Sequence, residues 1–365
     1  MNRPTAKTWG GFVVPLLLAV ALGAVACGNG SPRHDRTPPI TPSTTTASPT
    51  VTTTGNPAPP GKLGTVKPGP FTSFHCTPGF RCREFVVTCP GVQDPARAML
   101  EQQQPQGSPR GVVLYFSGET GQRPWVDPSA APQTVGFMRS VAKAGLMNVM
   151  VAWEDPWLVS APGEEAGPAR LACRAASLIR YVHDSLFEPL GVHPAPETCG
   201  FCVAGESGGA GEVAYALSRY GLARDIDAAV MSGGMPFASI EKGCLKTTTP
   251  YWYGPTAAAF VDAGYGFSPS QRGPCASARA SFKPRWVADS VNGPDAVLSY
   301  PSTRLEIIVG AEDASSAVPL GLDYIAALHA AGTPSLHVRT VPGLAHGLAS
   351  DPGGLAAVRE ALLSG

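Results

Sequence analysis

The segment that decides the fold reads FCVAGESGGAGEVAYALSRYG, residues 201–221, and it joins two patterns of secondary structure at one serine. Its first five residues are apolar or small, which is typical of a strand that is buried on both faces. The residues after Ser207 predict about three turns of helix that end at Gly221. A serine between such a strand and helix lies on a sharp turn, and small neighbours such as Gly205 and Gly209 let the strand and the helix approach each other.

Strand and helix patterns alternate along most of the chain. Strands are predicted at 83–88, 111–118, 146–153, 201–205, 226–232, 304–310 and 336–341, and helices at 134–144, 169–187, 209–220, 319–331 and 355–363. Such alternation favours right-handed crossovers and one mostly parallel sheet with helices on both faces. Residues 235–300 show no regular pattern and are predicted to form an insert in this single α/β domain.

The motif Gly-Glu-Ser-Gly-Gly at 205–209 has two interpretations. Gly-x-Ser-x-Gly surrounds the nucleophile of α/β-hydrolases, whereas Gly-Asp-Ser-Gly-Gly, one methylene shorter, is found in chymotrypsin-like proteases. Those proteases are β-barrels in which the histidine and the aspartate precede the serine. A helix is predicted after Ser207, and the histidines before it lack the sequence setting of that family: His34, His75, His183 and His193. These features argue against the protease.

In α/β-hydrolases the acid and then the histidine follow the serine along the chain. His346 lies in the segment VPGLAHG, after the last predicted strand, where a loop can carry a side chain over the serine. His329 and His337 also follow Ser207, but they fall within a predicted helix and a predicted strand. His346 is therefore the candidate base.

The acid is expected on the loop after the preceding strand. Asp313 ends the segment IIVGAED, and Glu312 beside it is the alternative. The ordered set Ser207, Asp313 and His346, together with the alternation of strands and helices, resembles the α/β-hydrolase superfamily over residues 83–365 apart from the insert. The resemblance implies an α/β-hydrolase fold and serine esterase or lipase-like chemistry.

That chemistry assigns a role to each residue. A serine hydroxyl is a weak nucleophile unless a base takes its proton, so His346 would act as the base and then as the acid, and Asp313 would fix its tautomer. Backbone N–H groups would bind the oxyanion. One donor would be Gly208, and the other Glu119 or Thr120 in the turn after strand 111–118, with Glu119 preferred. No cofactor is required.

The insert carries aromatic side chains that either grip an acyl, aryl or sugar group or pack its own core: Tyr251, Trp252, Tyr253, Phe260, Tyr265, Phe267 and Trp286. Few charges lie among them, so a neutral carboxylic ester, small or polymeric, is the leading substrate class. A peptidase or an acyltransferase on the same fold is an alternative, as is a non-catalytic hydrolase-like domain that binds at the cell surface. Glu206 is interpreted as a solvated or loop-pairing residue rather than a catalytic one.

Residues 1–26 are predicted to be a signal peptide, because two basic residues precede an uncharged apolar run that ends in small residues. Cys27 directly after this run resembles the lipid-attachment site of bacterial lipoproteins, with ordinary secretion as the alternative. Lipidation would anchor the protein to the outer face of the cytoplasmic membrane. Residues 27–70, rich in Thr, Ser and Pro, are predicted to be a disordered spacer, and residues 71–365 the catalytic domain.

Charge and cysteine content limit the partners. The whole chain has 27 basic and 27 acidic residues and no basic run, which argues against a nucleic-acid partner. Eight cysteines follow Cys27, and an even number in an exported chain favours disulfides, with Cys244 and Cys275 as the expected local pair. Cys199-Gly-Phe-Cys202 has no second CxxC to complete a zinc site, so no metal is expected.

Overall fold

The computed structural model describes residues 61–73, 76–125, 132–193, 198–268 and 270–364. The predicted signal peptide, Cys27 and most of the predicted spacer lie outside the described residues. Of the two units into which the chain divides, the described part belongs to the second, Gly55–Gly365. No helix in the described ranges is long and apolar enough to cross a membrane.

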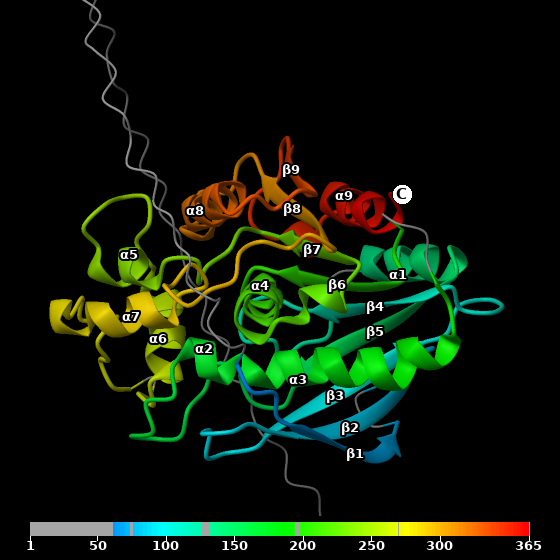
Figure 1. The fold of residues 1–365 in the computed structure, drawn as a ribbon, viewed down its shortest axis with the longest axis horizontal. Helices are drawn as coiled ribbons and strands as arrows, with labels where there is room; N and C mark the ends of the chain where they lie inside the picture. Colours follow the sequence, from blue (N-terminus) through cyan, green and yellow to red (C-terminus); the bar gives the residue numbers. More distant parts are fainter. Residues whose placement is uncertain (1–60, 74–75, 126–131, 194–197, 269, 365) are drawn as a thin grey trace, which may run out of the picture. The chain divides into compact units, whose positions relative to one another are not determined.

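A single sheet forms the centre of the described domain (Figure 1). Its strands are β1 (Thr65–Thr72), β2 (Arg81–Thr88), β3 (Ala96–Gln103), β4 (Gly111–Phe116), β5 (Leu146–Trp153), β6 (Phe201–Glu206), β7 (Ala228–Ser232), β8 (Arg304–Gly310) and β9 (Leu336–Val341). They lie in the order β1-β2-β3-β5-β4-β6-β7-β8-β9. The pairings from β1 to β5 are antiparallel, and those from β5 to β9 are parallel. The predicted mostly parallel sheet is confirmed.

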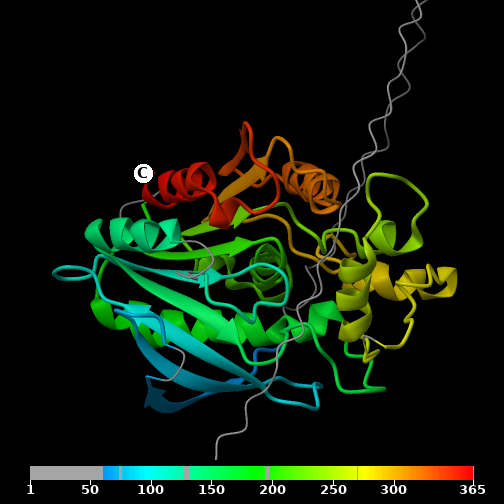
Figure 2. The same cartoon turned by 180° about the vertical axis from the view of Figure 1, so that it is seen from behind.

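Helices cover both faces of the sheet, as predicted. The helices outside the insert are α1 (Gln133–Lys143), α2 (Pro168–Leu171), α3 (Cys173–Val182), α4 (Gly208–Tyr220), α8 (Ala317–Ala330) and α9 (Pro352–Leu363). The larger core lies between the sheet and α3, α4 and α8, and the smaller core lies under α1 and α9 on the other face (Figure 2). Strands β4 and β6 contribute to both cores, so they read as continuous apolar runs.

The predicted boundary of the spacer at residue 70 is wrong, because β1 (Thr65–Thr72) already belongs to the sheet. This strand has the sequence TVKPGPFT, and most of it is exposed. Prolines are tolerated within a strand mainly where it lies at the edge of a sheet, as β1 does, or at a bulge. An edge strand of this composition carries no alternating apolar pattern, so it lacks the signal by which the buried strands were predicted.

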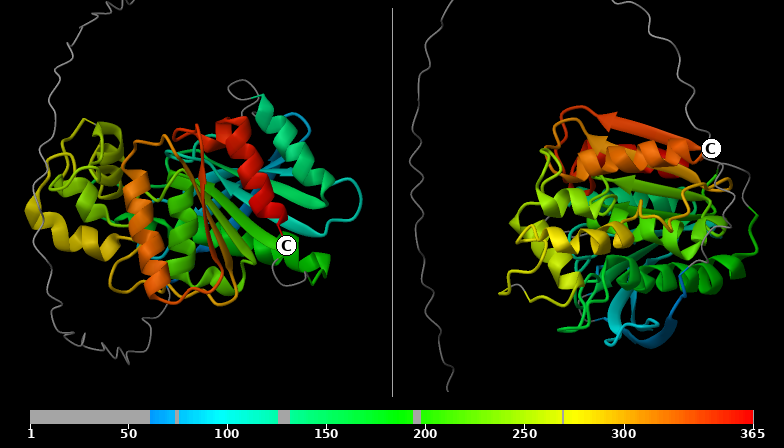
Figure 3. Two further views of the ribbon diagram at one scale, coloured as in Figure 1. Left: turned by 90° about the horizontal axis from the view of Figure 1, so that it is seen from above. Right: turned by 60° about the vertical axis from the view of Figure 1, so that its left-hand side comes forward.

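The insert at 235–300 is more regular than predicted. It contains the helices α5 (Ile240–Leu245), α6 (Pro255–Gly264) and α7 (Lys283–Asp289), which lie together beside α8 (Figure 3). The insert follows the carboxyl end of β7, so it stands at the same edge of the sheet as the residue that follows β6. A binding site at this edge is expected in parallel sheets.

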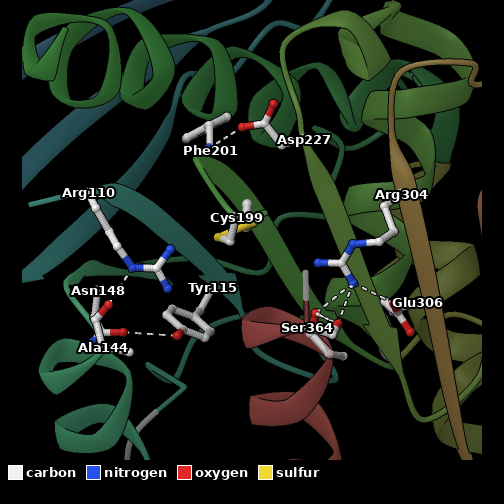
Figure 4. The surroundings of a disulfide bond; sticks show 12 residues. Arg110, Tyr115, Ala144, Asn148, Cys199, Phe201, Asp227, Arg304, Glu306 and Ser364 are labelled. Atoms are coloured by element: carbon white, nitrogen blue, oxygen red, sulfur yellow. Dashed lines mark hydrogen bonds and ion pairs between the residues drawn. A yellow bond between two sulfur atoms is a disulfide. The ribbon is translucent and has the colours of Figure 1, made fainter. Parts of the chain in front are cut away.

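The eight cysteines of the described residues form four disulfides: Cys76–Cys82, Cys89–Cys173, Cys199–Cys202 and Cys244–Cys275. The predicted pair within the insert is thereby confirmed. The CxxC forms a disulfide at the amino end of β6, beside Phe201 (Figure 4). Its sulfur atoms bond to each other, which leaves no thiolate there for a zinc ion.

Candidate active site

Ser207 lies between β6 and α4 in a conformation that few residues other than glycine adopt. Its φ is 49° and its ψ is −109°. Backbone hydrogen bonds hold it there, because its N–H donates to the carbonyl of Ser232 at 2.8 Å and its carbonyl accepts from Gly211 at 3.1 Å. A strained residue that is held so firmly between a strand and a helix is typical of a nucleophile elbow.

The flanking glycines are required by close contacts of the backbone. A Cβ atom on Gly205 would lie 2.4 Å from the carbonyl oxygen of Gly209, and one on Gly209 would lie 2.2 Å from that of Phe116. Both separations are far shorter than a carbon and an oxygen allow. The interpretation that small residues let the strand and the helix approach is confirmed.

The structure brings together the three side chains that the sequence predicts. His346 Nε2 lies 2.9 Å from Ser207 Oγ, and His346 Nδ1 lies 2.8 Å from Asp313 Oδ2. Asp313 comes from the turn after β8, and His346 from the loop after β9. The alternative acid, Glu312, has an exposed side chain, and its hydrogen bond to the loop of His346 runs from its backbone N–H to the carbonyl of Leu344.

The hydrogen bonds among Ser207, His346 and Asp313 favour a charged aspartate and a basic histidine. The hydrogen bond to Asp313 raises the pKa of His346 more than burial lowers it. Burial alone would raise the pKa of Asp313, but hydrogen bonds from His346 and Ser315 together hold it below its ordinary value. An ionised Asp313 accepts the Nδ1 proton of His346, so neutral His346 presents the lone pair of Nε2 to the Ser207 hydroxyl.

Ser315 is a residue of the site that the sequence prediction missed. Its N–H donates to Asp313 Oδ1 at 2.8 Å, and its hydroxyl lies 3.2 Å from His346 Nδ1. It thus occupies the second oxygen of the carboxylate and fixes the orientation of the acid. A serine two residues after an aspartate is a common turn motif, so its sequence position alone does not distinguish it.

The turn after β4 contacts the residue that follows the nucleophile. Glu119 has a positive φ of 53°. A Cβ atom on Gly208 would lie 2.1 Å from the carbonyl oxygen of Glu119 and 3.2 Å from its nitrogen. The two predicted oxyanion donors, Gly208 and Glu119, are therefore neighbours in space, and only a glycine fits at 208.

Glu206 does not behave as a solvated residue, but its predicted pairing with a loop is confirmed. Its Oε1 accepts a hydrogen bond of 2.9 Å from the N–H of Ala349, three residues after His346. Burial raises the pKa of Glu206, and the hydrogen bond from Ala349 works against that rise. A Cβ atom on Gly118 would lie 3.5 Å from Glu206 Oε2, so the carboxylate also borders the turn that carries Glu119.

Most aromatic side chains of the insert take one of the two roles that the sequence left open, whereas Trp252 is exposed and takes neither. Tyr253, Tyr265 and Trp286 are almost completely buried and pack the insert's core. Phe260 and Phe267 line a cavity that reaches the turn of Glu119. The sequence identified the aromatic cluster, but only the fold separates core residues from cavity residues.

No protein-family model and no curated protein matches this chain. Among solved structures it is similar to carboxyl esterase 2 from Tuber melanosporum, with 17% identity and a TM-score of 0.46 over 78% of this chain and 86% of that one. It is also similar to a bacterial heroin esterase, with 19% identity and a TM-score of 0.48 over 79% of this chain and 86% of that one. A third is a bacterial brefeldin A esterase, with 16% identity and a TM-score of 0.48 over 78% of this chain and 76% of that one.

Similarity at this level does not assign an activity. The strand order, the crossovers and the sharp turn between β6 and α4 are features of this chain itself. The serine, the acid and the histidine follow strands β6, β8 and β9 in that order, and they meet at the carboxyl edge of the sheet. The chain has the α/β-hydrolase fold, with an insert between β7 and β8.

Proposed function

We propose that this protein is a serine hydrolase that cleaves neutral carboxylic esters through an acyl-enzyme on Ser207. The observation that carries the proposal is the continuous chain of hydrogen bonds from Asp313 through His346 to Ser207, at 2.8 and 2.9 Å. Both distances lie within the reach that proton transfer needs without rearrangement. The strained backbone of Ser207 aims the hydroxyl at His346 rather than into the core.

The first half of the reaction forms the acyl-enzyme. His346 Nε2 takes the proton of Ser207 as Oγ attacks the ester carbonyl, and Asp313 stabilises the imidazolium that results. The carbonyl oxygen becomes an oxyanion, and the N–H groups of Gly208 and Glu119 are its proposed donors. When the tetrahedral intermediate collapses, the bond to the alcohol breaks, and His346 returns the proton to the departing oxygen.

The second half releases the acid. A water molecule gives its proton to His346 and attacks the acyl carbon, so a second oxyanion forms at the same N–H groups. Its collapse breaks the bond to Oγ, and Ser207 regains its proton from His346. Every proton is returned, and the net reaction is ester plus water to acid plus alcohol.

Turnover assays on the mature full-length protein test this proposal. We expect hydrolysis of p-nitrophenyl esters but not of peptide p-nitroanilides, and a Ser207→Ala variant that folds normally and shows no turnover. Hydrolysis of the anilides at comparable rates would favour a peptidase. Ester hydrolysis that persists in Ser207→Ala contradicts the assignment of the nucleophile, and a folded wild-type protein that turns over neither substrate favours the non-catalytic alternative.

We also propose that the protein is exported and anchored through lipidated Cys27. The signal-like pattern of residues 1–26 supports export, as do the four disulfides, which persist mainly in oxidising compartments. Mass spectrometry of the mature amino terminus is expected to find a diacylglycerol on Cys27, and Cys27→Ser is expected to release the protein from the membrane fraction. A mature protein that begins at a residue other than Cys27 and carries no lipid would contradict the proposed lipid anchor.

A further inference from the structure

A cavity of about 640 Å³ lies beside the turn of Glu119. Its walls come from three segments that are distant in sequence: the turn after β4, the loop 156–162, and the insert with helix α6. Its larger apolar lining residues include Leu158, Val159, Phe237, Phe260 and Phe267. This volume falls in the range of about 300–1,000 Å³ that small-molecule sites occupy.

The walls of the cavity carry almost no charge. Among the described residues that line it, Glu119 is the only ionisable one, and the polar remainder consists of hydroxyl side chains. A ligand with a negatively charged tail would leave water here without gaining an opposite charge, and a positively charged tail would meet only the single carboxylate of Glu119. An uncharged apolar group would gain by burial against the aromatic and aliphatic walls.

The cavity borders the candidate site through two of its lining residues. Glu119 lines the cavity, and its backbone lies against Gly208, the residue after the nucleophile. Phe237 lines it too, and it packs on the first turn of α4, where a Cβ atom on Gly211 would lie 2.4 Å from its ring. The cavity therefore lies next to the two proposed oxyanion donors.

Hydrogen bonds hold the wall formed by α6 in place. Asp262 accepts from the backbone N–H groups of Cys275 and Ala276 at 2.7 and 2.9 Å. The carbonyl of Ala263 accepts from the N–H of Ser160 at 3.1 Å, which ties α6 to the loop 156–162, another wall of the cavity. The disulfide of Cys275 secures the same part of the insert. The cavity is thus a formed part of the fold.

We propose that this cavity binds the acyl chain of the substrate and selects uncharged, apolar acyl groups. The inference rests on the proposed serine-hydrolase function. The leaving alcohol must lie near His346 Nε2, from which it receives its proton, whereas no described residue of the loops that carry Asp313 and His346 lines the cavity. The alcohol and the cavity are therefore on different sides of Ser207, which leaves the acyl chain to enter the cavity.

Ala259 and Ala263 control how much of the cavity is open. Both line it, and they lie one helical turn apart on the same face of α6. A leucine at either position would extend into the space that an acyl chain occupies. Ala326 on α8 is exposed and does not line the cavity, so Ala326→Leu adds the same bulk to a helix elsewhere.

The experiment measures kcat/KM for p-nitrophenyl acetate, butyrate, hexanoate and octanoate, and for acetate esters of longer alcohols. Burial of each methylene is expected to raise kcat/KM about fourfold along the acyl series until the cavity is full. A monosuccinate ester, whose acyl tail carries a carboxylate, is expected to react at least tenfold more slowly than the butyrate. Extension of the alcohol is expected to have a smaller effect.

The variants then separate this inference from the proposed function. Ala259→Leu and Ala263→Leu are expected to lose at least tenfold on octanoate while acetate hydrolysis stays within about twofold, and Ala326→Leu is expected to match the wild type. Three outcomes overturn the inference but leave the proposed function standing. They are acetate hydrolysis with no preference for acyl length, a preference for the length of the alcohol instead, and unchanged substrate profiles in both cavity variants. If no ester is hydrolysed, both the function and the inference fail. If neither leucine variant folds, the wild-type rates for the acyl series, the alcohol series and the monosuccinate ester test the inference by themselves.

Discussion

Replacing Asp313 with asparagine changes the charge at the centre of the site and keeps the shape of the side chain. Ser315 N–H donates to one oxygen of Asp313, and His346 Nδ1 lies 2.8 Å from the other. In Asp313→Asn the amide oxygen stays with the Ser315 donor, so the amide NH₂ faces Nδ1. Nδ1 must then accept, and the proton moves to Nε2, where it prevents His346 from taking the proton of Ser207.

The size of the effect follows from the same geometry. An imidazolium and a carboxylate 2.8 Å apart attract each other by about 6 kcal/mol at an effective dielectric constant of about 20. Asp313 is 1% exposed, but the His346 side chain is 41% exposed, so water screens part of this attraction. We therefore expect kcat/KM to fall by about 10³- to 10⁴-fold, equivalent to about 4–5.5 kcal/mol.

The assay compares kcat/KM for one p-nitrophenyl ester in the wild type, Asp313→Asn and Glu312→Gln. Glu312 is exposed and adjacent in sequence, so Glu312→Gln is the matched control and is expected to stay within about threefold of the wild type. Thermal unfolding of all three establishes that each is folded. Retention of a tenth of the activity in Asp313→Asn, or an equal loss in both variants, would refute the role given to Asp313.

Three further perturbations have defined outcomes. Glu206→Gln is expected to move the acid limb of the kcat/KM profile to lower pH, because the charge of Glu206 helps to raise the pKa of His346; an unmoved limb contradicts this. Burial raises the pKa of Glu212 well above 4.5, so the contribution of Glu212 to folding stability falls as pH rises above that value. Glu212→Gln is therefore expected to raise Tm at pH 8 but not at pH 4. Equal changes in Tm at both pH values would contradict this prediction. Loss of the Cys89–Cys173 bridge, which spans 84 residues, is expected to lower the free energy of unfolding by about 4 kcal/mol in urea titrations of the double serine variant, and a change under 1 kcal/mol speaks against it.

The parallel part of the sheet and the site at its edge were predictable because burial leaves a clear record in the sequence. Strands 146–153 and 304–310, both almost completely buried, were located to the residue. The elbow was predictable because its constraints fall on adjacent residues: the turn needs Ser207 between a strand and a helix, and the close backbone contacts require glycine on both sides.

Strands with an interrupted apolar pattern and long-range contacts were not predictable in this way. Strand β3 reads ARAMLEQQ, in which polar residues obscure the alternation, and β1 contains two prolines. The pairing of Glu206 with Ala349 joins residues 143 apart, and no local pattern marks it. The cavity is formed by three distant segments, so its apolar character becomes evident only when the fold brings them together.

The most direct test of the central proposal is to identify the residue that a fluorophosphonate modifies. The reagent bonds to an activated serine, so peptide mapping by mass spectrometry of the treated wild-type protein should find a single adduct, on Ser207. Ser207→Ala should carry none, and Asp313→Asn should react at least 10³-fold more slowly. A folded wild-type protein that remains unmodified, or one that carries the adduct on another serine, would contradict the assignment of Ser207 as the nucleophile.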